Sequence, residues 1–261
     1  MTDDVDPAIP RTALVTGGAK RIGRAVCDGL AADGWRVALH YHGSSEEADE
    51  ACAEIAAASG RTVVPVRADL ADPAETRALI GAAVAAVGPL GLLVNSAAIF
   101  EGPDWRETTE GEIDRHMAIN FRAPLVLMQE FARALPKDAG GTVVNIIDQR
   151  VWNLTPYFPA YTASKTALWT ATRQMALALA PRIRVNAVGP GPTLQGPRQS
   201  PADFEAQWRG VPLARRTRAS EIAEAVLFLA RARAVTGQML ALDGGEHLGW
   251  RQDSDGTAPV E

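Results

Sequence analysis

The stretch TALVTGGAKRIG, residues 12–23, decides the fold because it joins a short apolar run to a glycine-rich turn. The apolar residues predict a strand over Thr12–Thr16, and the Ala-rich residues that follow predict a helix over 22–32. Small residues let the backbone turn tightly, so that the N-terminus of the helix can face the pyrophosphate of a dinucleotide. Such a turn is a weak signal alone and a strong one directly after the first strand of a βα series.

Short apolar runs alternate with Ala-rich segments along the rest of the chain. Runs such as TVVNII (142–147) are apolar on both faces, as expected of a parallel sheet covered by helices on each side. The alternation predicts an α/β, single-domain Rossmann fold with a doubly wound, seven-stranded parallel sheet. The expected strands are Thr12–Thr16, Val37–Tyr41, Thr62–Arg67, Gly91–Asn95, Thr142–Asp148, Ile183–Val188 and Met239–Leu242, and the expected helices are 22–32, 45–58, 73–87, 109–135, 160–180 and 220–231.

The composition restricts the class of protein. With 261 residues, 47% hydrophobic and 22% charged, the chain can bury one large core. We expect a flexible tail over 1–10, one Rossmann-fold domain over 11–250 and a second tail over 251–261, because both ends are polar and aperiodic. The net charge of −5 argues against a nucleic-acid partner. The absence of a long apolar run argues against a membrane partner.

The cysteines and histidines do not predict a metal site or a disulfide. Cys27 and Cys52 fall in Ala-rich segments and are expected to be buried, reduced thiols. His40 and His42 could imitate a metal pair, but no third ligand is near them in the sequence, so we predict no metal. The acidic N-terminus lacks the apolar region of a signal peptide. Together these features predict a cytoplasmic protein.

Positive charge near the first turn favours NADPH over NADH. An NAD site usually places Asp or Glu at the end of the second strand, whereas this chain has no carboxylate there until Glu46. Lys20 and Arg21 supply positive charge where a 2′-phosphate would sit, although they could also be solvated surface charges. The expected contacts at this end are Lys20, Arg21, His42, Ser44 and Ser45.

Two further strand ends carry candidates for the adenosine half. Asp69, followed by Leu70, could accept a hydrogen bond from the adenine amino group, and it is also a plausible helix cap. Asn95 follows the fourth expected strand and can hold the adenosine side of the cofactor. In an open α/β sheet, ligands bind outside the carboxyl ends of the strands, which is where these residues lie.

Tyr161 and Lys165 are four residues apart in an expected helix, so their side chains share one face. The ammonium group is expected to lower the pKa of the phenol and make it a proton donor near neutral pH. Asp148 stands thirteen residues before Tyr161, at the end of an expected strand. It could instead cap a turn or pair with Arg150.

The chain resembles the short-chain dehydrogenase/reductase family over roughly residues 11–248. The motifs are the turn at 16–23, Asn95-Ser96-Ala97-Ala98, Asn120, Tyr161 to Lys165, Pro190-Gly191 and Asp243-Gly244-Gly245. The resemblance implies that Tyr161 donates the proton, that Lys165 also binds the nicotinamide ribose, and that Asn120 anchors a water of the proton relay. It also implies a homotetramer, to which the long helices would contribute. The cofactor contacts that it implies are Gly17, Ile22, Gly23, Leu70, Asn95, Ser96, Ala97, Tyr161, Lys165, Pro190, Gly191 and Thr193.

Three positions depart from the common family pattern. Arg21 replaces a usual second glycine, Asn95-Ser96-Ala97-Ala98 replaces Asn-Asn-Ala-Gly, and Asp148 replaces the usual catalytic serine. Arg21 and Asp148, with the stretch Gly18–Arg24 and the segment His40–Ser44, resemble the pteridine reductase and dihydromonapterin reductase branch, in which a phenylalanine at the place of Phe100 stacks on the pterin. Ala98 departs from that branch, where a polar residue can contact the pterin. The substrate contacts implied are Arg21, Phe100, Asp148, Tyr161 and Leu194.

An aspartate and a serine suit different substrates. A serine can donate a hydrogen bond to a ketone oxygen, whereas an ionised Asp148 cannot, and would repel a developing oxyanion. It suits a ring with N–H groups, such as a pterin, and can relay a proton to a ring nitrogen. Two alternatives stay open, a carbonyl or 3-oxoacyl reductase and a non-enzymatic NADPH-binding protein. The segment Pro192–Ala202 is expected to be a lid over the substrate.

Overall fold

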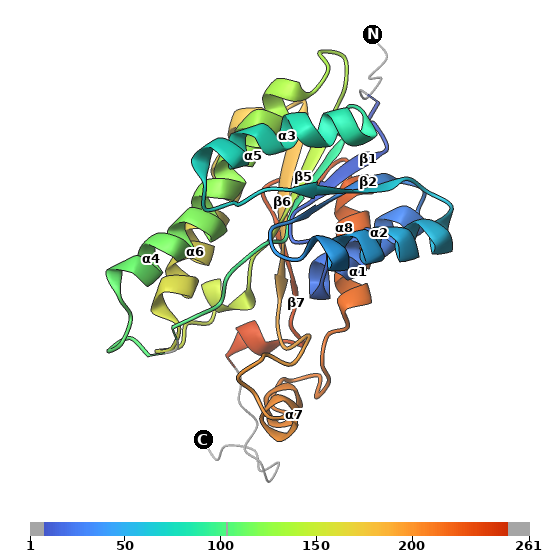
Figure 1. Ribbon diagram of the computed structural model, residues 1–261. Coiled ribbons are helices and arrows are strands. Elements are labelled where there is room, and N and C mark those ends of the chain that lie inside the picture. The colour runs from blue at the N-terminus through green and yellow to red at the C-terminus, as the bar shows by residue number, and fades with distance from the viewer. Residues whose placement is uncertain (1–7, 103, 250–261) are drawn as a thin grey trace.

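Seven parallel strands form one twisted sheet in the order β3-β2-β1-β4-β5-β6-β7 (Figure 1). The computed structural model describes residues 8–102 and 104–249. The order reverses between β1 and β4, which is where ligands bind in doubly wound sheets. The strands are β1 Thr12–Val15, β2 Arg36–Tyr41, β3 Val63–Arg67, β4 Leu92–Asn95, β5 Gly141–Ile146, β6 Ile183–Pro190 and β7 Met239–Leu242.

Helices cover both faces of the sheet. One layer contains α1 (Arg21–Ala32), α2 (Ser45–Ser59) and α8 (Ala219–Arg231), and the other contains α3 (Pro73–Val87), α5 (Ala123–Ala134) and α6 (Pro159–Leu179). α4 (Glu110–His116) leads into a π-helical turn, Met117–Arg122, before α5. α7 (Pro201–Arg209) stands away from both layers, beyond the carboxyl end of β6 (Figure 1).

The alternation of side chains along each strand divides the core in two. In β1, Ala13 and Val15 face the α1 and α8 side, whereas Leu14 faces the α3 and α5 side, and all three are fully buried. Phe131 of α5 is 1% exposed and packs in the core on the α3 and α5 side of the sheet. Burying each such aliphatic or aromatic side chain stabilises the fold by about 1.5–3 kcal/mol. The sheet therefore holds the strand ends, and the residues that follow them, in fixed positions.

The predicted fold class and the seven strands are confirmed, and two helix predictions are wrong. The expected helix 109–135 is divided by the π-helical turn at 117–122. The expected lid, Pro192–Ala202, runs into an additional helix, α7. Its start was marked in the sequence by Ser200 and Asp203, which form a capping box in which each side chain accepts a hydrogen bond from the other residue's backbone.

The expected tail over 1–10 is shorter than predicted. Ala8 accepts a hydrogen bond from the backbone N–H of Gly140, and Ile9 packs against the core, so residues 8–10 belong to the domain. Residues 1–7 and the expected tail 251–261 lie outside the described residues. Within the described part of the chain, no helix is long and apolar enough to cross a membrane.

Candidate active site

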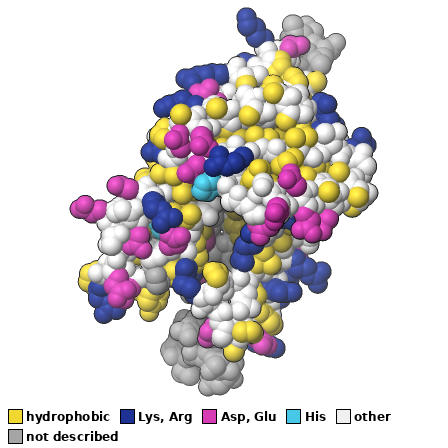
Figure 2. All heavy atoms as spheres, in the orientation of Figure 1, with side chains coloured by type: hydrophobic (Ala, Val, Ile, Leu, Met, Phe, Trp, Pro, Cys, Tyr) yellow, Lys and Arg dark blue, Asp and Glu magenta, His cyan; other side chains and the backbone are white. Residues whose placement is uncertain are grey.

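A cavity of about 1050 Å³ opens at the carboxyl ends of the strands, between the sheet and the segment that leads to α7. The space-filling view shows a hollow on this face with Lys and Arg side chains around it (Figure 2). Residues from five separated parts of the chain line it, including the predicted catalytic residue Asp148 and several predicted substrate residues. They include Lys20, Arg21, Phe100, Asp148, Gln149, Arg150, Phe158, Thr193, Leu194, Arg198 and Glu246.

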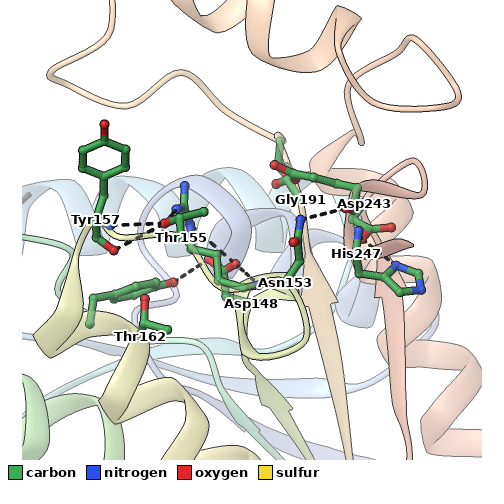
Figure 3. Close-up of polar contacts among 12 residues, drawn as sticks. Asp148, Asn153, Thr155, Tyr157, Thr162, Gly191, Asp243 and His247 are labelled. Atoms are coloured by element: carbon green, nitrogen blue, oxygen red, sulfur yellow. Dashed lines mark hydrogen bonds and ion pairs between the residues drawn. The ribbon is translucent and has the colours of Figure 1, made fainter. Parts of the chain in front are cut away.

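Asp148, which lines this cavity, forms a direct pair with Tyr161. The Tyr161 hydroxyl donates to Asp148 Oδ2 at 2.9 Å, and the backbone N–H of Arg150 donates to Asp148 Oδ1 at 2.9 Å. Asp148 therefore caps a turn and accepts the hydrogen bond of the phenol at once. Figure 3 shows Asp148 and Asn153 across from Gly191 and Asp243, which follow β6 and β7. The strand ends thus bring the pair next to the predicted nicotinamide contacts.

The expected effect of Lys165 on the Tyr161 hydroxyl is absent from this structure. Burial raises the pKa of Tyr161 well above its usual value, and the nearby Asp148 carboxylate raises it further. Lys165 Nζ donates to the backbone oxygen of Ile146 at 2.8 Å and lies 5.8 Å from the centre of the Tyr161 ring. Burial lowers the pKa of Lys165 to about 8. The phenol therefore keeps its proton, which it donates in a hydrogen bond to Asp148.

Burial also raises the pKa of Asp148 above its usual value, despite its hydrogen bonds and the neighbouring Arg150. The Arg150 guanidinium lies 4.0 Å from Asp148 Oδ1, at the limit of an ion pair. A buried carboxyl of this kind can take up and release a proton more readily than an exposed aspartate. The pair therefore has the composition of a proton relay.

Asn120 lies in the π-helical turn and uses its side chain to hold the chain that follows β4. Its Oδ1 accepts from the Ile99 backbone N–H at 2.9 Å, and its Nδ2 donates to Ile99 O and Ser164 Oγ, both at 3.0 Å. The next residue, Phe100, projects into the cavity, with its ring 4.4 Å from that of Tyr161. Asn120 thus positions Phe100. The predicted role of Asn120 as a water anchor stays a prediction.

The turn after β1 fits a pyrophosphate. Gly17 has φ +65°, and a Cβ there would lie 3.0 Å from Ala97 Cα, while a Cβ on Gly23 would lie 2.1 Å from Gly17 O. Thr16 Oγ1 accepts from the backbone N–H groups of Ser96 and Ala97, which fixes the opposite wall. No side chain caps the N-terminus of α1, so its free N–H groups remain available to an anion. The residues present therefore fit a dinucleotide cofactor.

The adenosine end is more crowded than the sequence suggested. Lys20 forms an ion pair with Glu47, and Ser44 caps α2 by accepting from the Glu47 backbone N–H. His42 Nε2 lies 3.7 Å from Asp69 Oδ2. The predicted role of Asp69 as a helix cap is wrong, because Asp72 is the N-cap of α3, while Asp69 closes a short turn through the Ala71 N–H.

Asn95 is the residue whose environment best fits the expected adenosine contact. Its Nδ2 donates to Asn145 Oδ1 at 2.8 Å, and its own Oδ1 is buried without a hydrogen-bond partner in the described chain. Buried polar atoms are nearly always hydrogen-bonded, so this oxygen is available to a ligand donor. Leu70, in the segment that follows β3, is also buried, with 5% of its surface exposed.

Arg21 faces the substrate side of the cavity. Its guanidinium donates to the backbone oxygens of Leu194 and Gln195, each at 3.1 Å, and so ties the lid to the first turn. Its backbone has φ +55°, in the left-handed region, which explains why glycine is usual at this place in the family pattern. The structure thus places the Arg21 guanidinium against the segment at 194–195, among the expected substrate contacts, and its expected contact with the 2′-phosphate stays a prediction.

Sequence reasoning missed several side chains of the cavity. Arg150 and Arg198 lie over the rings of Phe100 and Phe158, which are themselves 4.2 Å apart, and Phe158 has φ +58°. Arg150 could have been found from its place two residues after Asp148. Phe158 depends on a left-handed conformation that the sequence does not mark. Glu246 comes from the far end of the chain and has no local signal.

Comparisons with known proteins agree with this geometry. A family model described as enoyl-(acyl carrier protein) reductase matches residues 17–247. A "short-chain type dehydrogenase/reductase" of Picea abies is 30% identical, over 90% of this chain and 92% of that protein. The 3-oxoacyl-[acyl-carrier-protein] reductase FabG of Staphylococcus aureus is 32% identical, over 91% of this chain and 98% of that protein.

A solved structure is more similar still. The crystal structure of "FolM Alternative dihydrofolate reductase 1" from Brucella canis, complexed with NADP, is 46% identical and covers 93% of this chain and 96% of that one, with a TM-score of 0.88. The similarity therefore extends over the sheet, both helical layers and the segments that line the cavity.

Proposed function

Because the chain belongs to the short-chain dehydrogenase/reductase family, we propose that it is an NADPH-dependent reductase that converts a dihydropterin to its tetrahydro form. Its cofactor is NADP(H), which the FolM structure also contains. The finer assignment, a pteridine as substrate, is supported by the 46% identity to FolM alternative dihydrofolate reductase 1 of Brucella canis. A cytoplasmic location and a homotetrameric assembly remain predictions.

Asp148 carries the proposal. It accepts the Tyr161 hydroxyl hydrogen and lies in a cavity that also contains the Phe100 ring. A carboxylate here would repel the oxyanion that develops when a ketone is reduced, and it would attract the N–H groups of a pteridine. Phe100 offers a flat aromatic face of the kind that stacks on a planar ring. The two residues together therefore favour a nitrogen-rich ring over a carbonyl.

The residues of the chain supply binding and proton transfer. When bound, NADPH supplies the hydride that reduces the carbon of the C=N bond. The Tyr161 hydroxyl gives its proton to the adjacent ring nitrogen, and a proton taken up from solvent by the Asp148 carboxylate then passes along the 2.9 Å hydrogen bond to restore the phenol. The buried Lys165 ammonium is held by Ile146 O at a position where it can bind a ribose hydroxyl. Positioned general acids of this kind accelerate reactions by roughly 10²–10⁴-fold.

Reduction of a 3-oxoacyl thioester is the second candidate. The 32% identity to FabG of Staphylococcus aureus favours it. Asp148 argues against it, because a carbonyl reductase needs a hydrogen-bond donor at this place and the carboxylate offers an acceptor. A non-enzymatic NADPH-binding role would leave the Tyr161–Asp148 pair without a purpose.

The test is NADPH oxidation by the pure protein with dihydrobiopterin, dihydromonapterin, dihydrofolate, a 3-oxoacyl thioester and a panel of small ketones. We expect turnover of at least one pteridine and little or none of the ketones. The Tyr161→Phe variant is the control, and should lose at least about 100-fold in kcat while still binding NADPH. Turnover of ketones alone would exclude the pteridine assignment and leave the family and the cofactor intact.

A further inference from the structure

The wall of the cavity contains the carboxyl group of Glu246, which has no role in the reaction proposed above. Glu246 begins the short 3₁₀ turn Glu246–Leu248 after β7 and lines the same cavity as Asp148. Its Oε2 is buried and has no hydrogen-bond partner in the described part of the chain. A Cβ placed on Gly191 would lie 3.0 Å from this oxygen, so the carboxyl sits directly beside the backbone that follows β6.

The charged groups around Glu246 do not neutralise it. Arg150 lowers its pKa, Asp148 and Asp243 raise it, and burial is the largest effect, so that the pKa rises to about 7. The Arg150 guanidinium is engaged by Thr155 Oγ1 at 3.1 Å and lies near Asp148. His247 Nδ1 is 2.7 Å from Asp243 Oδ2. A partner for the Glu246 carboxyl must therefore come from what occupies the cavity.

The local fold does not depend on the Glu246 carboxyl. The backbone oxygen of Glu246 accepts from Asn153 Nδ2 at 3.0 Å, and its backbone N–H donates to Asp243 O at 3.3 Å. Both bonds use the main chain and survive a change of side chain. Since buried polar atoms are nearly always hydrogen-bonded, an unpaired carboxyl oxygen without a structural role indicates a ligand contact.

We propose that Glu246 is a substrate-binding carboxyl that accepts a hydrogen bond from the 2-amino group of the pterin, and so selects aminopteridines over rings that lack this group. The inference rests on the proposed function. Asp148 acts on the reacting nitrogen through Tyr161. Glu246 accepts a hydrogen bond from an N–H group elsewhere on the same ring. A pterin offers such a donor at its amino group, whereas a lumazine carries an oxygen there. That oxygen would face Glu246 acceptor to acceptor and cost binding energy.

The test compares a 7,8-dihydropterin with the 7,8-dihydrolumazine that carries the same side chain. In an assay above pH 7, where Glu246 is mainly ionised, we expect the natural protein to prefer the dihydropterin by about tenfold or more in kcat/KM, as for one hydrogen bond to a charged group. Glu246→Leu removes both oxygens at similar size and should bring the two substrates to within about twofold of each other. Glu246→Gln keeps one oxygen and should fall between. Glu224→Gln, on the exposed face of α8, is the matched control and should leave the preference unchanged.

Each outcome of this test either supports the inference about Glu246 or overturns it. An equal loss for both substrates, a preference that Glu246→Leu leaves intact, or no preference in the natural protein would overturn the inference. If Glu246→Leu fails to fold, Glu246→Gln and the natural preference still decide. NADPH affinity, measured by fluorescence titration, should be unchanged, and a weakened affinity with an intact preference would assign Glu246 to the cofactor instead. Asp148-dependent pterin turnover with no effect of Glu246 would remove only this inference, whereas turnover of ketones alone would remove it together with the proposed function.

Discussion

A single imidazole, that of His40, connects the glycine-rich turn to the end of β3. Its Nδ1 accepts from the Gly17 backbone N–H at 3.1 Å, and its Nε2 donates to the Ala68 backbone oxygen at 3.0 Å. These bonds require the neutral ring with its hydrogen on Nε2. The side chain is 2% exposed, and burial lowers its pKa to about 4. A neutral His40 therefore holds the turn that would carry the pyrophosphate.

This arrangement predicts that the protein loses stability in mild acid. The pKa of His40 is about 4 in the folded chain against 6.5 for an unperturbed histidine, so between these values the unfolded chain binds the extra proton. Stability then falls as the pH drops through that window, by about 2 kcal/mol from pH 7 to pH 5. Urea unfolding at both pH values should show this loss, and His40→Gln should reduce it. An equal loss in the variant would rule out His40 as its source.

At the scale of elements, the segment from Gly191 to Ser200 joins β6 to α7 and covers the cavity. Arg21 holds it from α1 through Leu194 and Gln195, and Arg198 Nη2 donates to the Phe100 backbone oxygen at 2.9 Å. The lid is therefore fixed to both sides of the site. The left-handed backbone of Arg21 costs of order 1–3 kcal/mol, which its side-chain contacts offset.

Arg21→Gly should separate lid closure from folding stability. Glycine relieves the φ of +55° while both lid bonds are lost. We expect the free energy of unfolding to change by less than about 1 kcal/mol, and the KM for the substrate to rise about tenfold. Hydrogen exchange should become faster in the lid around Gln195.

Arg24→Ala is the control for the lid, because Arg24 lies on the same helix and binds Asp28 and Glu54 at the surface. It should leave both KM and lid exchange unchanged. If Arg21→Gly also leaves them unchanged, the lid is held by other contacts.

At the scale of the whole molecule, exposed apolar side chains on the helices that the sequence assigned to an interface support the predicted homotetramer. Leu177 of α6 is 84% exposed and Ile113 of α4 is 44% exposed. Light scattering should give a mass of four chains, and Leu177→Glu should reduce it. Glu50→Lys, on the exposed surface of α2, should leave the mass unchanged. A natural protein that is monomeric would contradict the prediction.

The sheet could be predicted well because most strands are apolar on both faces and an α-helical segment follows each strand except the last. The sequence also predicted Asp148 and Phe100 in one cavity with Tyr161 in contact with both, since each is close to a strand end or lies on the helix that follows. Contacts between distant segments could not be predicted in this way. The bond of Arg21 to the lid and the approach of Glu246 to Gly191 depend on tertiary packing, which leaves no periodic signal in the chain.

The pKa of Tyr161 likewise depends on contacts that could not be predicted from the sequence. The i, i+4 spacing placed Lys165 on the same helical face as Tyr161, as expected. It could not show that Ile146 O engages the ammonium group, or that Asp148 keeps the hydroxyl proton. Burial and the neighbouring Asp148 carboxylate raise the pKa of Tyr161, and helical spacing does not decide the direction of this shift.

The measurement that tests the central claim most directly is the substrate preference of Asp148→Ser. The kcat/KM for a dihydropterin and for a small ketone should be measured with NADPH for the natural protein and the variant. We expect the variant to lose about 100-fold or more on the dihydropterin and to gain activity on the ketone, because a hydroxyl donor replaces the acceptor beside Tyr161. Undiminished turnover of the dihydropterin by Asp148→Ser would contradict the account.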